Sequence, residues 1–294
     1  MNYVTTTLYR PIPRIETPRA TGNRINEVEA RFEIGEEEDI MVRRIDPDGP
    51  DMARMPPRPG AAAAPATPIP AEFGAGNDDA LIERKNYKIR LADTDHGRST
   101  ASMLINKMYG WRGYGDSHEI KGGPDRITLT ATDKQFLIGT ITLGMDSDNG
   151  LLADEVFKSE IDVFRAAGGK ACELTKLAID PSGASKLALA SLFHILFIYA
   201  RRLNGCTDVF IEVNPRHRRF YENMLGFERL CEDRNNPRVN APAALLWISL
   251  DNVERQIAEH GGTSEHDSRN RSLYPYFFSK VEEDGIYGRL KTIG

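Results

Sequence analysis

Along residues 86–250, segments whose hydrophobic spacing is typical of strands alternate with segments whose spacing is typical of helices. Short runs rich in β-branched and aromatic residues predict strands at 86–92, 126–132, 135–145, 171–179, 207–215 and 241–250. Longer runs with apolar residues three or four positions apart predict helices at 94–111, 151–169, 186–203 and 216–225. This order predicts an α/β (α+β) domain with one mixed sheet flanked by helices.

Turn and cap residues divide these segments. The pair Asp133-Lys134 separates two alternating runs and predicts an antiparallel hairpin. Thr94 and Asp95 are both suited to cap the helix that follows them. Gly168-Gly169, Asn204-Gly205 and Gly226 each stand where a helix is expected to end.

The first 80 residues have a different composition from the rest. They are rich in Pro, Ala, Gly and acid, have few aromatic residues, and carry 14 acidic and 9 basic side chains. Such a segment cannot bury enough apolar surface to offset its ordering entropy, so we expect a disordered tail. We expect one folded domain at 81–260 and a helical extension packed on it at 261–294.

Charge and cysteine usage exclude several classes of protein. The net charge of −5 resides in the tail, and residues 81–294 are neutral, so a general nucleic-acid surface is not expected. Cys172, Cys206 and Cys231 form no C-x-x-C pair, which argues against a metal site and a disulfide framework. The longest apolar run, 187–200, is too short to span a bilayer, and the N-terminus lacks a signal-peptide pattern. We expect a cytoplasmic protein without stable membrane insertion.

Two charges stand in the strand "ACELTKLAID". Glu173 and Lys176 are three residues apart, so a regular strand would direct them to opposite faces, and only a bulge would bring them together. Taken alone, Glu173 fits a salt bridge and Lys176 an exposed strand position.

Motifs in the second half of the chain resemble the GNAT acyltransferase superfamily. Tyr221, Leu225, Gly226 and Phe227 match its Tyr-x-x-x-Leu-Gly-Phe ending. More narrowly, "CELTKLAID" and "NPRHRRFYENMLGF" are similar to the long-chain N-acyl amino acid synthases, which are related to the acyl-homoserine-lactone synthases. The resemblance covers about 165 residues, from about 87 to 250. It implies a GNAT-like, mostly antiparallel sheet and attack of an amine on an acyl thioester.

The resemblance also implies roles for individual residues. Glu173 would be the general base and Tyr221 the acid that protonates the departing thiolate, although a packed core tyrosine is an equal alternative. A bulged strand would present the backbone N–H groups of Leu177, Ala178 and Ile179 to the developing oxyanion. Contacts with substrate or pantetheine are implied for Lys176, Asn214, His217 and Trp111.

One departure from the superfamily bears on the acyl donor. Coenzyme-A-dependent members carry a glycine pair at the helix after this strand, whereas "PSGASKLALASLF" has Gly183 alone. Ser182, Ser185 and Lys186 could hold the single phosphate of an acyl-phosphopantetheine, or the serines could simply cap the helix. We therefore expect an acyl carrier protein as donor and partner, with no permanent cofactor. Basic residues near the proposed mouth could attract its acidic surface: Arg201, Arg202, Arg216, Arg218 and Arg219.

The expected function is transfer of a long acyl chain from acyl carrier protein to the α-amine of an amino acid. A coenzyme-A-dependent N-acetyltransferase is the alternative enzyme, and a lactone synthase is disfavoured by Thr175-Lys176-Leu177 in the signature strand. A non-catalytic acyl-binding module is the alternative from another class. His194 is expected in the core, and the walls of an acyl tunnel are sought among Phe136, Leu143, Phe164 and Phe193.

Overall fold

The computed structural model describes residues 68–70, 80–111, 117–180, 185–263 and 272–293. Its strands are β1 (Ile69–Pro70), β2 (Ile82–Arg84), β3 (Tyr87–Leu91), β4 (Arg126–Asp133), β5 (Phe136–Met145), β6 (Ala171–Ile179), β7 (Asp208–Val213), β8 (Glu228–Arg229), β9 (Arg234–Asn236) and β10 (Ala241–Ser249). Its helices are α2 (Asp95–Trp111), α3 (Asp154–Ala166), α4 (Lys186–Phe197), α5 (Arg218–Leu225), α6 (Leu250–His260) and α7 (Lys280–Ile293). A π-helical turn, η3 (Ile198–Leu203), continues α4, and the 3₁₀ turns are η4 (Pro215–His217) and η5 (Tyr274–Tyr276).

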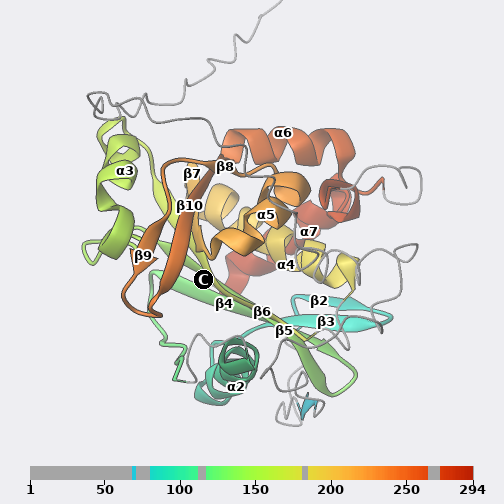
Figure 1. Ribbon diagram of the computed structural model, residues 1–294. Coiled ribbons are helices and arrows are strands. Elements are labelled where there is room, and N and C mark those ends of the chain that lie inside the picture. The colour runs from blue at the N-terminus through green and yellow to red at the C-terminus, as the bar shows by residue number, and fades with distance from the viewer. Residues whose placement is uncertain (1–67, 71–79, 112–116, 181–184, 264–271, 294) are drawn as a thin grey trace, which may run out of the picture.

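The strands form one mixed sheet in the order β2-β3-β4-β5-β6-β7-β10-β8, with β1 paired to β5 and β9 to β10 (Figure 1). Only β6 and β7 run parallel among the strand pairs of the described residues. The parallel pair is possible because α4 and η3 carry the chain back across the sheet between the two strands. This arrangement confirms the expected α/β class and the mostly antiparallel sheet.

The helices cover the two faces of the sheet. On one face, α2 packs on Leu137 and Ala178, and α3 packs on Phe210 and Trp247. On the other face lie α4, α5, α6 and α7, which form a single core with the central strands. Figure 1 shows α2 below the sheet and α4, α6 and α7 above it.

The turn residues account for most of the boundaries. Lys134 takes a positive φ between β4 and β5, where Asp133 pairs with Phe136, so the predicted hairpin is confirmed. Thr94 accepts a hydrogen bond from the Gly97 N–H and begins α2. Gly226, at φ 79°, ends α5 in the left-handed conformation that glycine adopts without strain.

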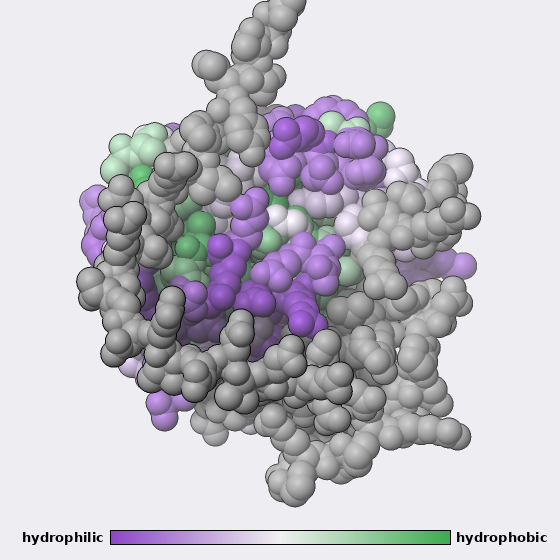
Figure 2. All heavy atoms as spheres, turned by 45° about the horizontal axis from the view of Figure 1, so that its top comes forward, coloured by the Kyte–Doolittle hydropathy of each residue, from purple (hydrophilic) through white to green (hydrophobic). Residues whose placement is uncertain are grey.

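Helix α6 follows β10 without a loop. Its buried residues are Leu250, Val253 and Ile257, and its exposed residues include Asp251, Glu254 and Arg255. Figure 2, which brings the top of Figure 1 forward, shows hydrophilic side chains over this helix. Helix α6 therefore covers the core with one face and meets solvent with the other.

The N-terminal tail falls mostly outside the described residues and stays a prediction. Ile69 and Pro70 are an exception, because they pair with Leu137 and Phe136 of β5 and Ile69 is buried. This short part of the predicted tail therefore belongs to the sheet. No helix among the described residues is long and apolar enough to cross a membrane.

Candidate active site

The parallel strands β6 and β7 separate partway along their length. Their pairing in the described structure extends from Ala171 opposite Asp208 to Leu174 opposite Ile211. Beyond that point β6 stays with β5 as far as Ile179, whereas β7 stays with β10 as far as Val213. The two strands diverge, and the edge of β6 at residues 175–179 is not covered by β7.

A bulge interrupts β6 at this opening. Thr175 pairs with Thr142 and Ala178 with Thr140, so two residues of β6, Lys176 and Leu177, face one residue of β5. Lys176 has a φ of 54°, a conformation that costs a side-chain-bearing residue about 1–2 kcal/mol. The edge that carries the backbone of Leu177, Ala178 and Ile179, the expected oxyanion donors, is thus bent away from a regular ladder.

The bulge brings Lys176 to the same face as Glu173. Its ammonium group donates a hydrogen bond to the Glu119 carbonyl, in the segment that packs under α2. Burial lowers the pKa of Lys176, and the nearby positive charge of Arg126 lowers it further. The bulge that the sequence left open is therefore present, and it brings Glu173 and Lys176 to one face of the sheet.

Glu173 is buried, with 3% of its surface exposed. Its Oε1 accepts the Leu152 N–H at 2.8 Å and its Oε2 accepts the Ala153 N–H at 3.1 Å, just before α3 begins. Gly144 lies opposite on β5, and a side chain there would come within 3.3 Å of the Glu173 carboxylate.

Two opposing effects set the proton affinity of Glu173. Burial raises the pKa of its carboxyl, and this effect outweighs the two backbone hydrogen bonds and the charges of Arg126 and Arg238, which lower it. Glu173 therefore caps α3 and is at the same time more basic than an exposed carboxylate. The salt bridge considered from the sequence is replaced by backbone hydrogen bonds.

Further charged residues surround Glu173 on this face. Glu212 of β7 accepts hydrogen bonds from Asn236 and, at 2.8 Å, from Arg238. Arg238 also donates to the Leu152 carbonyl and contacts Glu155 of α3 at 3.1 Å. Sequence reasoning missed Asn236 and Arg238, because they belong to a polar stretch that resembles an ordinary loop. Only the pairing of β9 with β10 brings them to the site.

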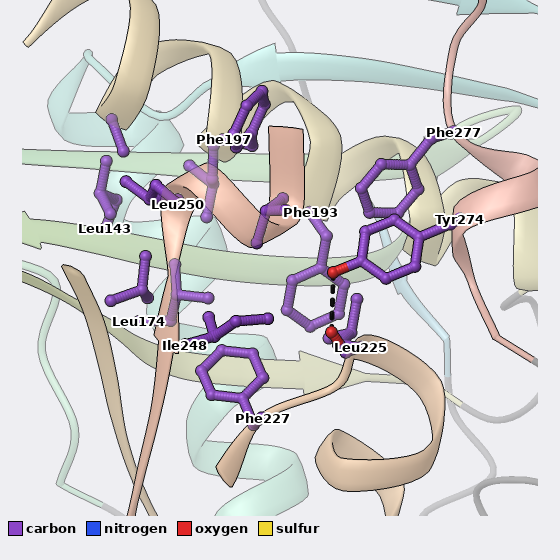
Figure 3. Close-up of a pocket in the computed structure, with 14 residues that line it drawn as sticks. Leu143, Leu174, Phe193, Phe197, Leu225, Phe227, Ile248, Leu250, Tyr274 and Phe277 are labelled. Carbon is purple, nitrogen blue, oxygen red and sulfur yellow. Dashed lines mark hydrogen bonds between the residues drawn. The ribbon is translucent and has the colours of Figure 1, made fainter. Parts of the chain in front are cut away.

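An apolar cavity of about 40 Å³ lies on the opposite face of the same strands (Figure 3). Leu143 and Leu174 of the sheet form its floor, and Phe193 and Phe197 of α4 form one side. Two of the four expected tunnel residues, Leu143 and Phe193, line it. Phe164 does not, because it packs against Phe210 and Trp247 under α3.

Tyr221 lies on the cavity side of the sheet. It is buried in the α4 core with Phe220 and Phe227 packed edge-on against its ring. Glu173 faces α3 on the other side of the sheet. The expected acid and base are thus not on one face, and they could act on one thioester only across the opening between β6 and β7.

Several residues assigned to phosphate or pantetheine cap helices in this structure. Ser185 accepts the Ala188 N–H at 3.1 Å and caps α4, and the Lys186 ammonium lies 4.4 Å from the Tyr276 ring centre. Asn214 accepts the Arg216 N–H at 3.2 Å, and Arg216 Nε donates to the His217 ring at 3.2 Å. Ser182 and the Trp111 side chain lie outside the described residues; Trp111 is the last residue of α2.

The five arginines of the expected carrier-protein surface divide into two groups. Arg201 pairs with Asp251 and Glu254 of α6, and Arg202 pairs with Glu283 and Asp284 of α7. These ion pairs join η3 to α6 and α7, and the docking role of the two arginines stays a prediction. Arg216 lies in η4, and Arg218 and Arg219 begin α5, where Arg218 pairs with Glu222 and Arg219 is exposed.

The described residues include no cluster of His, Cys, Asp or Glu side chains that could hold a metal ion. The three cysteines are free, with Cys172 and Cys206 buried. His194 is fully buried in the core, as expected.

Comparison with known proteins places this geometry in a family. The family model "N-acyl amino acid synthase FeeM" matches residues 100–249. The solved structure of FeeM, an N-acyl amino acid synthase from uncultured soil microbes, has 26% identity and a TM-score of 0.51, and the match covers 57% of this chain and 94% of that one.

Two acyl-homoserine-lactone synthases are more distant. LasI has 14% identity and a TM-score of 0.42, covering 56% of this chain and 90% of that one. BjaI, a coenzyme-A-dependent enzyme solved with MTA, has 15% identity and a TM-score of 0.39, covering 57% and 85%. A comparison with curated proteins gave no match. With half of its length matched by the family model, the chain is an N-acyltransferase with the GNAT fold that belongs to the FeeM family of N-acyl amino acid synthases.

Proposed function

We propose that this protein transfers a long acyl chain from the phosphopantetheine thioester of an acyl carrier protein to the α-amine of an amino acid. The observation that carries the proposal is the opening between β6 and β7. A charged site with Glu173, Lys176 and Arg126 lies on one face of the sheet there, and an apolar cavity lies on the other. An amino acid suits the charged site and an acyl chain suits the cavity.

In the proposed reaction, the amine nitrogen attacks the thioester carbon and the C–S bond breaks. The products are an N-acyl amino acid and the free pantetheine thiol. Glu173 accepts the proton that the amine loses, through a water molecule, and the raised pKa of its carboxyl suits this role near neutral pH. Within residues 177–179 at the bulge, the backbone N–H groups that point away from β5 stabilise the oxyanion.

Lys176 and Tyr221 have supporting roles in this proposal. The Lys176 ammonium binds the carboxylate of the acceptor amino acid, which would also keep its amine close to Glu173. Tyr221 gives its phenolic proton to the departing thiolate. Because Tyr221 and Glu173 lie on opposite faces, the thioester would have to occupy the opening between the strands.

The donor is proposed as a carrier protein on two grounds. Gly183 stands without the second glycine of a pyrophosphate cradle, and Arg216, Arg218 and Arg219 form a basic group beside η4. Asn214 and His217 lie on the same turn and would contact the pantetheine arm. Ser182, Ser185 and Lys186 at the start of α4 would receive its phosphate.

The test uses the purified chain with one acyl group supplied either on acyl carrier protein or on coenzyme A. A mixture of amino acids serves as acceptor, and mass spectrometry identifies the products. We expect N-acyl amino acids, with a kcat/KM at least tenfold higher for the carrier-protein donor. An N-acetyl product formed only from acetyl-coenzyme A would replace the proposal with the acetyltransferase alternative. Binding of acyl donors without any product would favour a non-catalytic module.

Charge reversal tests the docking surface. Arg219→Glu should raise KM for the acyl carrier protein and leave KM for a free acyl-pantetheine unchanged. Lys158→Glu on α3 makes the same change of charge on the opposite side of the sheet and serves as the matched control. Equal effects of the two variants would show that Arg219 does not contact the carrier.

A further inference from the structure

The C-terminal segment lies beyond the residues that the family model matches, yet it completes the apolar cavity. Leu273, Tyr274, Phe277 and Phe278 are each no more than 3% exposed. The Leu273 N–H donates to the Met224 carbonyl at 2.9 Å, and the Tyr274 hydroxyl donates to the Leu225 carbonyl at 2.7 Å. Tyr274 and Phe277 both line the cavity, and Figure 3 shows their rings beside Phe193.

The cavity as it stands is too small for a long chain. Its volume is about 40 Å³, which is room for only a few water molecules, since one water needs about 10–15 Å³ of such a cavity. A bound acyl chain therefore has to displace part of the lining.

The parts of the lining differ in how firmly they are held. Leu143 and Leu174 belong to central strands with a paired neighbour on either side, and Phe193 belongs to α4. Tyr274 is attached to the body through its hydroxyl and through the neighbouring Leu273 N–H. Tyr274 and Phe277 belong to a short turn, which the Gly262 N–H also holds by donating to the Phe277 carbonyl at 2.9 Å, rather than to a central strand.

His194 of α4 fixes the other end of this segment. Its Nδ1 accepts the Phe278 N–H at 2.9 Å, so in the neutral ring the proton is on Nε2, which lies 3.4 Å from Glu283 Oε2. The imidazole is stacked on Phe277, with ring centres 4.9 Å apart, and on Phe278 at 5.1 Å. Glu283 is in turn bound by Arg202 at 2.7 Å. His194 thus connects α4 to both the aromatic pair and α7.

We propose that Tyr274 and Phe277 are the end wall of the acyl cavity and set the longest chain that the enzyme accepts, with His194 as the residue that positions this wall. The proposal rests on the proposed function, because it assumes that the cavity receives the acyl chain. The ligand class is a saturated alkyl chain, because the cavity is lined by aliphatic and aromatic side chains.

The experiment measures chain-length selectivity with the full-length enzyme. Acyl-pantetheines from butanoyl to hexadecanoyl compete for one amino-acid acceptor, and mass spectrometry gives the ratio of products. Phe277→Leu should move the ratio of hexadecanoyl to octanoyl product by about tenfold or more toward the longer chain, since a change of a few methylene-sized groups in an apolar pocket has an effect of that order. Tyr274→Phe, which removes the hydrogen bond to Leu225, should move the ratio in the same direction.

Phe164→Leu is the matched control. Phe164 is an equally buried aromatic residue, but it lies under α3 on the opposite face of the sheet. The Phe164→Leu variant should lose stability as Phe277→Leu does, but it should keep the wild-type product ratio. If Phe277→Leu shifts the ratio no more than Phe164→Leu, these residues are not the end wall.

Two variants separate positioning by His194 from a general loss of stability. In His194→Gln the side-chain carbonyl can accept the Phe278 N–H while the amide donates to Glu283, so the wild-type ratio should be retained. His194→Leu removes both interactions and should broaden the range of accepted chains. Equal product ratios in both variants would remove His194 from the proposal.

Binding measurements keep the end wall testable if no acyl transfer is found. Alkyl-pantetheine thioethers of increasing length are titrated into the wild type and Phe277→Leu by calorimetry. A limit in chain length that rises in the variant supports the wall even if the proposed reaction fails. The same limit in both proteins overturns it.

Discussion

Glu173→Gln is the most informative single substitution in this protein, because the carboxylate has both a structural and a proposed chemical role. Its two oxygens accept the Leu152 and Ala153 N–H groups at 2.8 and 3.1 Å, and only 3% of the residue is exposed. A glutamine amide keeps one acceptor oxygen and turns an NH₂ group toward the other backbone N–H. One charge-assisted hydrogen bond is lost, at a cost of about 1.5–3 kcal/mol.

Two smaller effects modify that cost. The negative charge at the start of α3 contributes about 0.3–1 kcal/mol through the helix dipole, and this is lost as well. Removing a buried charge acts in the opposite direction, since burial raises the pKa of this carboxyl. We therefore expect Glu173→Gln to lower the free energy of unfolding by about 2 kcal/mol.

The effect on activity should be much larger than the loss of stability explains. Removal of a general base reduces the rate by about 10²–10⁴-fold. Urea unfolding gives the stability, and acyl transfer is measured at a temperature where the variant is fully folded. Trp247→Phe is the control, because it removes the 3.0 Å hydrogen bond to Asp208 in the α3 cluster at a similar cost and should leave activity within a few-fold of wild type. Full activity of a destabilised Glu173→Gln would refute the base assignment and leave Glu173 as a cap of α3.

Four further predictions concern the bulge and the C-terminal contacts. Burial lowers the pKa of His194 from its ordinary value of 6.5, so the unfolded chain takes up a proton at a higher pH than the folded one. The free energy of unfolding should therefore fall as the pH drops below about 6.5. Urea midpoints measured across this range should show that slope in the wild type and not in His194→Gln. Lys176 has a φ of 54°, so Lys176→Gly should change the free energy of unfolding by less than about 1 kcal/mol, whereas Lys176→Val should lower it by more than that. Similar urea midpoints for the two variants would contradict the left-handed bulge. Arg202→Met removes the 2.7 Å partner of the buried Glu283 carboxylate and should cost about 1–3 kcal/mol, measured by thermal unfolding, with an unchanged melting temperature showing that the contact does not hold α7. Burial raises the pKa of Glu283, but the contacts with His194 and Lys280 outweigh it and bring the value down from 4.5 to about 2, so the stabilisation from this carboxylate should be lost progressively as the pH falls from about 4.5 to about 2.

Local sequence patterns determined the element order of this protein. Strict alternation predicted β4 and β5 and their hairpin, and β6 and β10 were recognisable as apolar runs of strand length. Glycines at the helix ends were equally informative, because Gly168 and Gly226 adopt the left-handed conformations that end α3 and α5. Such features depend on residues close in sequence, so a single chain suffices to predict them.

The elements that sequence reasoning missed are those without a local signal. Strand β9 consists of Arg234-Asn-Asn236, and it is a strand only because β10 supplies its hydrogen-bond partners. Helix α6 begins at the residue after β10, with no turn residue to mark the change. The ion pairs of Arg201 and Arg202 could not be predicted, because the acidic partners, on α6 and α7, are 50 or more residues away in sequence.

The sequence by itself determined that two charged residues stand on β6, and the tertiary structure decided how they are arranged. Glu173 and Lys176 are three residues apart, which leaves their relative orientation open; the bulge against Thr140 and Thr142 settles it, and that register depends on β5. The structure also assigned Glu173 to the start of α3 and Tyr221 to the other face of the sheet. These outcomes depend on contacts between segments distant in sequence, and such contacts leave no periodic pattern in the chain.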